Sequence, residues 1–140
     1  MVVPPGHPLL SLNEPVTLQH LVHYPIITYQ IGYTGRFHID DAFFVEGLHP
    51  NVVLTAMDAD VIKTYVELGM GVGIVASVAL DAERDRNLRT IDVGHLFQVN
   101  VTRLGLRKGA WLRGYAYSFI ELFVPTLTAA VVKAALAGEA

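Results

Sequence analysis

The stretch IITYQIGYTGRFHIDDAFFVEGLHPNVVLTAMDADVIKTYVELGMGVGIVA, residues 26–76, decides the fold class. Runs of β-branched residues alternate in it with segments whose apolar residues recur every three or four positions, which predicts strands and helices in turn. The expected elements are strands over 26–29, 52–56 and 73–76 and helices over 34–46 and 58–68. Because the connections are short, we expect right-handed crossovers and a mainly parallel α/β sheet flanked by helices.

Polar residues and glycines mark the ends of both helices. Thr34 and Asp58 stand where N-caps belong, and Gly47 and Gly69 stand where the helices stop. Outside this stretch the pattern predicts strands over 2–3, 88–93 and 101–106, a short helix over 17–23, and helices over 111–124 and 128–136.

Composition limits the kinds of protein that this chain can be. Its 140 residues suit one domain of ordinary size, and the absence of cysteine excludes a disulfide framework and a thiolate metal site. Ten basic and thirteen acidic residues give a net charge of −3. A nucleic-acid-binding module normally carries a basic excess, so we expect this chain not to bind DNA by itself.

The chain is unusually apolar. Hydrophobic residues make up 52% and charged residues 16%, against about 25% in an average soluble protein, and the mean hydropathy is +0.41. The longest apolar run, Leu68–Leu80, is too short to span a bilayer and contains three glycines, and Met1–Gly6 does not resemble a signal peptide. We therefore expect a soluble cytoplasmic protein without a membrane partner, which buries surface against another copy or against a further part of itself.

Gly71–Ala76 matches the text of the dinucleotide fingerprint G-x-G-x-x-A. The fingerprint requires its glycines to follow a strand and to open a helix, where free N–H groups meet the pyrophosphate. Here a helical segment precedes the glycines and a β-branched run follows them. We therefore interpret the glycines as structural, and expect no nucleotide cofactor.

No group of residues indicates catalysis or metal binding. The six histidines are scattered, and no H-E-x-x-H motif or histidine–carboxylate pair at helical spacing accompanies them. The pairs Asp40–Asp41 and Asp58/Asp60 are better explained by solvation and helix capping than by acid–base chemistry. The serines lack the elbow motif of a nucleophile. We expect a protein that is not an enzyme and holds no metal or cofactor.

Gly32–Arg36 lies between a strand's carboxyl end and a helix start, where open α/β sheets bind ligands. Thr34 offers a hydroxyl to a ligand, and Gly35 allows the ligand to approach the backbone closely. Arg36 could add a charge-assisted contact to the ligand, besides those from the N–H groups of the first helical turn. The alternative is an ordinary capped loop, with Gly32 chosen for its turn geometry. The candidate ligand-binding residues are Thr28, Gln30, Tyr33, Thr34, Gly35 and Arg36.

The sequence resembles the LysR-type transcriptional regulators, in their CysB-like branch. The resemblance runs from about residue 2 to residue 136 and rests on six segments: Gly6–Leu9, Tyr24–Tyr29, Gly32–Arg36, Asp58–Val66, Gly71–Gly73 with Ala76–Ser77, and Leu112–Ile120. The Thr-Gly-Arg and Asp-Ala-Asp-Val-Ile-Lys words are the specific ones. Regulators of the family in general share only the Gly-His-Pro-Leu and Gly-x-Gly pieces.

The resemblance implies part of an effector domain of the type II periplasmic-binding-protein fold. Residues 2–100 would form its second, Rossmann-like subdomain, and residues 101–140 would return as a strand and helices into an incomplete first subdomain. The DNA-binding domain would be absent. A periplasmic-type solute-binding protein of the same fold is the alternative, and a small nucleotide-dependent enzyme is a weaker one.

The resemblance also implies a ligand and an assembly. In the family the threonine of the Thr-Gly-Arg loop contacts the effector, which would assign that role to Thr34, and effectors of this branch are small anions such as acetylserine or sulfate. Gln30 and Met57 depart from the family pattern and can alter the effector. Family members form homodimers or larger oligomers, and the helix after Asp58 supplies candidate contacts: Val61, Tyr65 and Val66.

Overall fold

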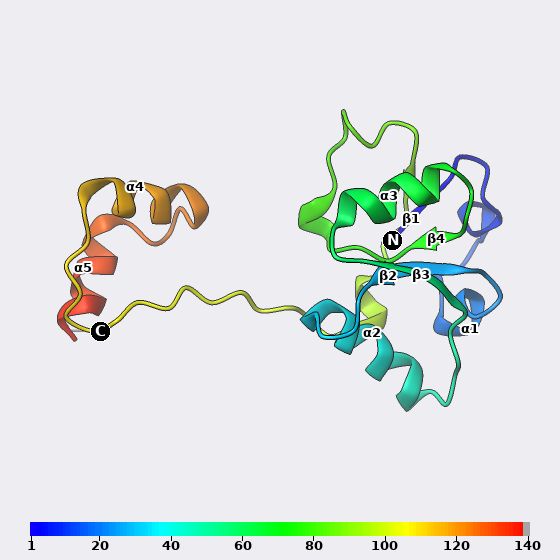
Figure 1. Cartoon of the computed structure of the whole chain (residues 1–140), viewed down its shortest axis with the longest axis horizontal. Coiled ribbons are helices and arrows are strands. Elements are labelled where there is room, and N and C mark those ends of the chain that lie inside the picture. The colour runs from blue at the N-terminus through cyan, green and yellow to red at the C-terminus, as the bar shows by residue number, and fades with distance from the viewer. Residues whose placement is uncertain (139–140) are drawn as a thin grey trace. The chain divides into compact units, whose positions relative to one another are not determined.

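The computed structural model describes residues 1–138, and the chain divides into two compact units, Met1–Asn100 and Val101–Ala140. Figure 1 shows helices on both sides of a sheet in the first unit, and the second unit contains α4 and α5. The last two residues of the predicted return segment, 139 and 140, lie outside the described residues.

The first unit is built on a five-stranded mixed sheet in the order β3-β2-β4-β1-β5. Its strands are β1 (Val2–Val3), β2 (Ile26–Tyr29), β3 (Val52–Ala56), β4 (Val72–Gly73) and β5 (Arg89–Thr90). The parallel pairing predicted for residues 26–76 is confirmed, because β2 pairs parallel with both β3 and β4. β1 precedes the strands that helical crossovers connect, and it pairs antiparallel with β4 and β5.

Helices cover both faces of the sheet, α1 (Leu18–Leu21) and α2 (Thr34–Val45) on one and α3 (Ala59–Glu67) on the other (Figure 1). Side chains alternate along a strand, so Ile26 packs toward α1 and α2 while its neighbour Ile27 packs toward α3. Short 3₁₀ helices at Pro8–Ser11, Ser77–Ala79 and Gly94–Leu96 complete the unit.

Glycines allow β4 to pass close to its neighbours. A Cβ on Gly73 would come within 2.7 Å of Val2 and 2.8 Å of Val66, and one on Gly71 would overlap the Pro25 carbonyl oxygen. Gly71 lies between α3 and β4, and Gly73 is the last residue of β4, so no helix begins at either glycine. The structural interpretation of the Gly-x-Gly motif therefore accounts for both positions.

The second unit is a pair of helices, α4 (Gly114–Phe123) and α5 (Ala129–Ala137), which pack around Ile120, Val132 and Leu136. The strand predicted over 101–106 is wrong. These residues have irregular, exposed backbone, because a strand needs a hydrogen-bonding neighbour and the described part of this unit contains none. Their β-branched and leucine-rich pattern alone could not reveal this.

Several other predicted elements exist with different limits. β4 covers only Val72–Gly73 instead of 73–76, and β5 only two residues of the predicted 88–93 strand. α1 is shorter than the predicted 17–23 helix and α4 shorter than the predicted 111–124 helix. Within residues 1–138, no helix is both long enough and apolar enough to cross a membrane.

His7 makes the start of the first unit sensitive to pH. Its Nδ1 accepts the Leu9 N–H at 3.3 Å and so caps the first 3₁₀ helix. Partial burial lowers the pKa of His7 below its ordinary value of 6.5. The unfolded chain therefore takes up this proton at a higher pH than the folded chain does. Its contribution to stability is present above pH 6.5 and is lost as the pH falls through 6.5 toward the lowered folded-state pKa.

The midpoint of thermal unfolding should fall less between pH 7.5 and pH 5.5 in the His7→Asn variant than in the unmodified chain. Asparagine also caps helix starts but does not titrate in this range. His49→Asn is the control, because His49 is exposed and makes no capping hydrogen bond to this helix. A His7→Asn chain with the same pH dependence as the unmodified and His49→Asn chains contradicts the assignment.

Candidate functional site

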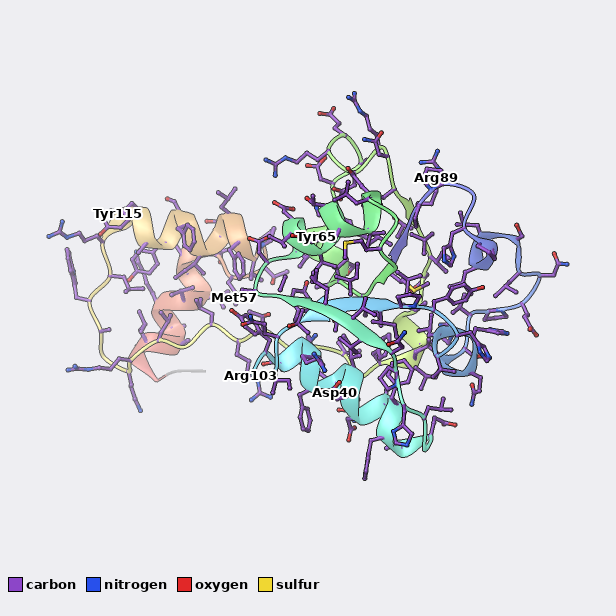
Figure 2. The ribbon with its side chains drawn as sticks, turned by 45° about the vertical axis from the view of Figure 1, so that its right-hand side comes forward. Asp40, Met57, Tyr65, Arg89, Arg103 and Tyr115 are labelled. Atoms are coloured by element: carbon purple, nitrogen blue, oxygen red, sulfur yellow. The ribbon has the colours of Figure 1, made fainter. Side chains whose placement is uncertain are left out.

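The carboxyl ends of β2 and β3 meet at one edge of the sheet because the two strands are parallel neighbours. Gln30 follows β2, and its N–H donates to the Ala56 carbonyl at 3.0 Å, which holds the two strand ends together. Met57 follows β3, and Figure 2 shows it on the side where α2 begins. α3 also begins at this edge, so strand ends and helix starts converge where α/β sheets bind ligands.

The two helix starts at this edge differ. Asp58 caps α3 with its own carboxylate, which accepts the Asp60 N–H at 2.6 Å, as predicted. α2 begins after Tyr33, and no side chain caps it. The prediction of Thr34 as the N-cap is therefore wrong: Thr34 is the first helical residue, and its side chain is exposed.

The uncapped start leaves α2 with donors for a ligand. Its first intrahelical hydrogen bond runs from the Phe37 N–H to the Tyr33 carbonyl at 3.1 Å, so the N–H groups of the three residues between them precede the helical ladder. The helix dipole places about half a positive charge at this end. An anion is the ligand that such a start favours.

A hollow of about 370 Å³ adjoins this helix start. Its lining comes from the loop after β2 and the first turns of α2: Ile31, Gly32, Tyr33, Thr34, Arg36, Phe37 and Asp40. A second hollow of about 550 Å³ lies farther along α2 and over the loop Gly47–Pro50, away from the strand ends. Three of the six candidate ligand-binding residues, Tyr33, Thr34 and Arg36, line the first hollow, and none lines the second.

Thr28 is not exposed at this edge. It is fully buried within β2, and its hydroxyl donates to the Ile74 carbonyl at 3.3 Å, which joins β2 to the chain leaving β4. Strand alternation placed Thr28 and Gln30 on one side, but Thr28 lies within β2 and is buried, whereas Gln30 follows the end of the strand and is exposed. In this structure its hydroxyl serves the fold.

Arg36 is also buried, with only 9% of its surface exposed. Its Nε donates to the Asp40 carboxylate at 2.7 Å and its Nη1 to the Tyr29 carbonyl at 3.0 Å. The guanidinium therefore links the end of β2 to the first turns of α2. The predicted contact between its charge and a ligand competes with these two partners.

Of the remaining predicted residues, Tyr33 and Thr34 line the hollow, whereas Gln30 and Gly35 do not. Gln30, Tyr33 and Thr34 are exposed, and the Tyr33 ring stacks on that of Tyr29 with centroids 6.3 Å apart. A Cβ on Gly35 would lie 3.6 Å from the Tyr29 ring, an ordinary contact, so Gly35 is not required for space on that side.

The prediction missed two residues of this arrangement, Tyr29 and Asp40. Besides its contacts with Arg36 and Tyr33, Tyr29 accepts the Ala76 N–H at its hydroxyl, 3.2 Å away. Asp40 was interpreted as a solvated carboxylate. The spacing of Arg36 and Asp40, four residues apart on a helix, was the available signal for their pairing.

The candidate interface residues on α3 have different surroundings. Val61 is 43% exposed and Tyr65 is half-buried, whereas Val66 is fully buried against the sheet. Val66 therefore cannot contact a second copy while the unit is folded. An interface at this helix stays a prediction for Val61 and Tyr65.

Among residues 1–138, no three histidine or carboxylate side chains gather to hold a metal.

An α/β unit with an uncapped helix start at its strand ends has the architecture of a ligand-binding domain. The profile of the LysR substrate-binding domain matches residues 1–128. The chain belongs to this family, and the resemblance noted in the sequence is confirmed.

Two curated relatives are transcriptional regulators from Burkholderia cenocepacia. The chain is 57% identical over 139 residues to the HTH-type regulator CysB, covering 99% of this chain and 44% of that protein. It is 58% identical over 132 residues to the HTH-type regulator SsuR, covering 94% of this chain and 42% of that protein. The chain thus spans less than half the length of these relatives. They are regulators and not enzymes, which agrees with the prediction that the chain is not an enzyme.

A solved structure supports the fold. The crystal structure of the cofactor-binding domain of the Cbl transcriptional regulator matches with a TM-score of 0.81 and 43% sequence identity, over 96% of this chain and 59% of that chain. The predicted LysR effector-domain fold is therefore confirmed.

Proposed function

We propose that this chain is the effector-sensing part of a CysB-like LysR-type regulator of sulfur or cysteine metabolism genes. It binds a small anion, acetylserine-like or sulfate, at the start of α2. The observation that carries this proposal is the uncapped α2 start beside the carboxyl ends of β2 and β3, in a chain of the LysR substrate-binding family.

The anion is held by neutral donors in this proposal. The hydroxyl of Thr34 gives one directional hydrogen bond, and the N–H groups of Thr34, Gly35 and Arg36 give the others. Gln30 and Tyr33 flank the anion from the loop, and Met57 bounds it from the end of β3. Thr28 and the Arg36 guanidinium are left out of the contact set, because the Thr28 hydroxyl and the Arg36 Nε and Nη1 already have partners and both residues are buried.

The signal passes to DNA through parts of the regulator beyond this chain. Residues 2–100 act as the second subdomain of the effector domain, and residues 101–140 return into the first. Anion binding shifts the population toward a closed arrangement of the two subdomains and changes the geometry of a cytoplasmic homo-oligomer. An N-terminal domain outside this chain contacts the promoter. This chain alone supplies half of the clamp, so it binds the anion weakly.

Thr34→Val tests the site. We expect the amide signals of residues 28–37 to shift when the unmodified chain is titrated with sulfate, and the variant to bind about 3- to 10-fold more weakly after losing one hydrogen bond. The fold tolerates the change, within about 0.5 kcal/mol, because Thr34 makes no capping bond. Acetylserine is titrated in parallel to compare the two anions.

Thr64→Val is the matched control. Its hydroxyl donates to the Asp60 carbonyl on α3, away from the hollow, so binding should not change. The proposed site is wrong if no amide between Thr28 and Phe37 responds to either anion, or if the Thr34→Val and Thr64→Val chains titrate alike.

A further inference from the structure

Arg36 and Asp40 form a bridge in the wall of the hollow that holds the proposed anion site. The guanidinium reaches the Tyr29 carbonyl with Nη1 and the Asp40 carboxylate with Nε, at 3.0 Å and 2.7 Å. Tyr29 ends β2, and Arg36 lies in the first turn of α2. The bridge therefore spans the loop 30–33, the segment that presents the site.

The geometry argues against direct contact between the Arg36 guanidinium and an anion. Only 11% of the Arg36 side chain is exposed, and its charge is already balanced by Asp40, whose side chain is 44% exposed. An anion that bound the guanidinium would have to displace this carboxylate or lie next to it. The N–H groups and the Thr34 hydroxyl offer an anion donors without either penalty.

We infer that Arg36 and Asp40 are a positioning pair for the anion site: Asp40 orients the guanidinium, and the guanidinium fixes the end of β2 against α2. The first-turn N–H groups and the loop thereby point into one hollow. This inference rests on the proposed function, because it concerns the anion bound at that site.

The test compares three Asp variants and one Arg variant by titration with inorganic sulfate, at a temperature where circular dichroism shows each chain fully folded. Asp40→Asn is the main variant. Asp41→Asn is its matched control, because it removes the same charge from the same helix without touching the bridge. Asp40→Glu keeps a carboxylate four residues from Arg36, and Arg36→Lys keeps the charge but loses the planar fork.

We expect Asp40→Asn and Arg36→Lys to weaken sulfate binding by about 3- to 10-fold, the effect of one hydrogen bond. Asp41→Asn should leave the dissociation constant within about twofold of the unmodified chain, and Asp40→Glu should restore most of the binding lost in Asp40→Asn. A direct contact predicts the opposite for Asp40→Asn, because removing the competing carboxylate would free the guanidinium and tighten binding.

The outcomes separate the two proposals. If the unmodified chain binds sulfate and Asp40→Asn binds it equally well or more tightly, the positioning pair is wrong. The proposed anion site is not contradicted by that result. Equal weakening by Asp40→Asn and Asp41→Asn also overturns the pair, because Asp41 does not contact Arg36 and the effect then does not depend on the bridge. An unmodified chain in which no amide responds to sulfate overturns both.

Discussion

Gly71→Ala is expected to lower the free energy of unfolding by about 3 kcal/mol, because alanine's Cβ would overlap the Pro25 carbonyl oxygen. That oxygen accepts the Val72 N–H at 2.9 Å, so it is fixed by the sheet and cannot move aside without breaking the hydrogen bond. The clash is with backbone, and no rotamer change relieves it. Urea unfolding followed by circular dichroism measures the loss.

Gly35→Ala is the control for Gly71→Ala within the same unit. A Cβ at Gly35 meets only ordinary contacts, 3.6 Å and beyond, and alanine favours a helix over glycine by up to about 1 kcal/mol. We therefore expect Gly35→Ala to be neutral or stabilising. Similar unfolding curves for the two variants would contradict the close contact between the Gly71 backbone and the Pro25 carbonyl oxygen.

The second large effect is expected for Lys63→Met, at about 3 kcal/mol of lost stability. Lys63 is 5% exposed, and its ammonium contacts Asp60 at 2.8 Å, Asp85 at 2.9 Å and the Ala79 carbonyl at 2.9 Å. It thereby holds the loop around Ala79–Asp85 to α3. Without it, the Asp85 carboxylate, 13% exposed, remains without its cation.

The pH dependence of this cluster follows from two shifted groups. Burial alone lowers the pKa of Lys63, but its hydrogen bonds to Asp60 and Asp85 outweigh burial and raise the pKa above its ordinary 10.5. The hydrogen bond from Lys63 lowers the pKa of Asp60 below 3.8. The stability that charged Lys63 provides is therefore lost only as the pH rises above 10.5. The stability that the ionised Asp60 carboxylate provides is lost only as the pH falls through the lowered pKa of Asp60. The difference between the unmodified and Lys63→Met chains should be constant from about pH 5 to pH 9.

A double-mutant cycle isolates the cluster. Adding Asp85→Asn to Lys63→Met should recover part of the lost stability, because it removes the carboxylate left without a cation. Arg86→Met is the control: it replaces an exposed cation in the neighbouring segment, and we expect a change within about 0.5 kcal/mol. A Lys63→Met chain as stable as the Arg86→Met chain would contradict the cluster's role.

The element order of residues 26–76 could be predicted because local signals and packing agree there. Ile26–Tyr29 and Val52–Ala56 were predicted with their exact limits, since prolines, glycines and polar residues bound them. Asp58 was recognised as a cap because a carboxylate before a helical pattern accepts first-turn N–H groups. Each of these features depends on a few neighbouring residues.

The surroundings of individual side chains could not be predicted in the same way. Thr28 and Arg36 are polar residues in the expected segments, yet their partners are the Ile74 and Tyr29 carbonyls, which only the folded backbone brings into reach. Val66 belongs to the apolar face of α3, and the pattern could not say which side of that face meets the sheet. Residues 101–106 carry a strand pattern but lack a strand to pair with.

The unpaired segment 101–106 has a consequence for how this chain behaves in concentrated solution. Val101 and Leu104 are exposed, so a second chain could add to this backbone and start aggregation. Arg103, Arg107 and Lys108 are interspersed with or follow the apolar residues, and Gly105 interrupts them. Like charges repel when such segments stack in register, so these cations act as gatekeepers that oppose self-assembly of the segment.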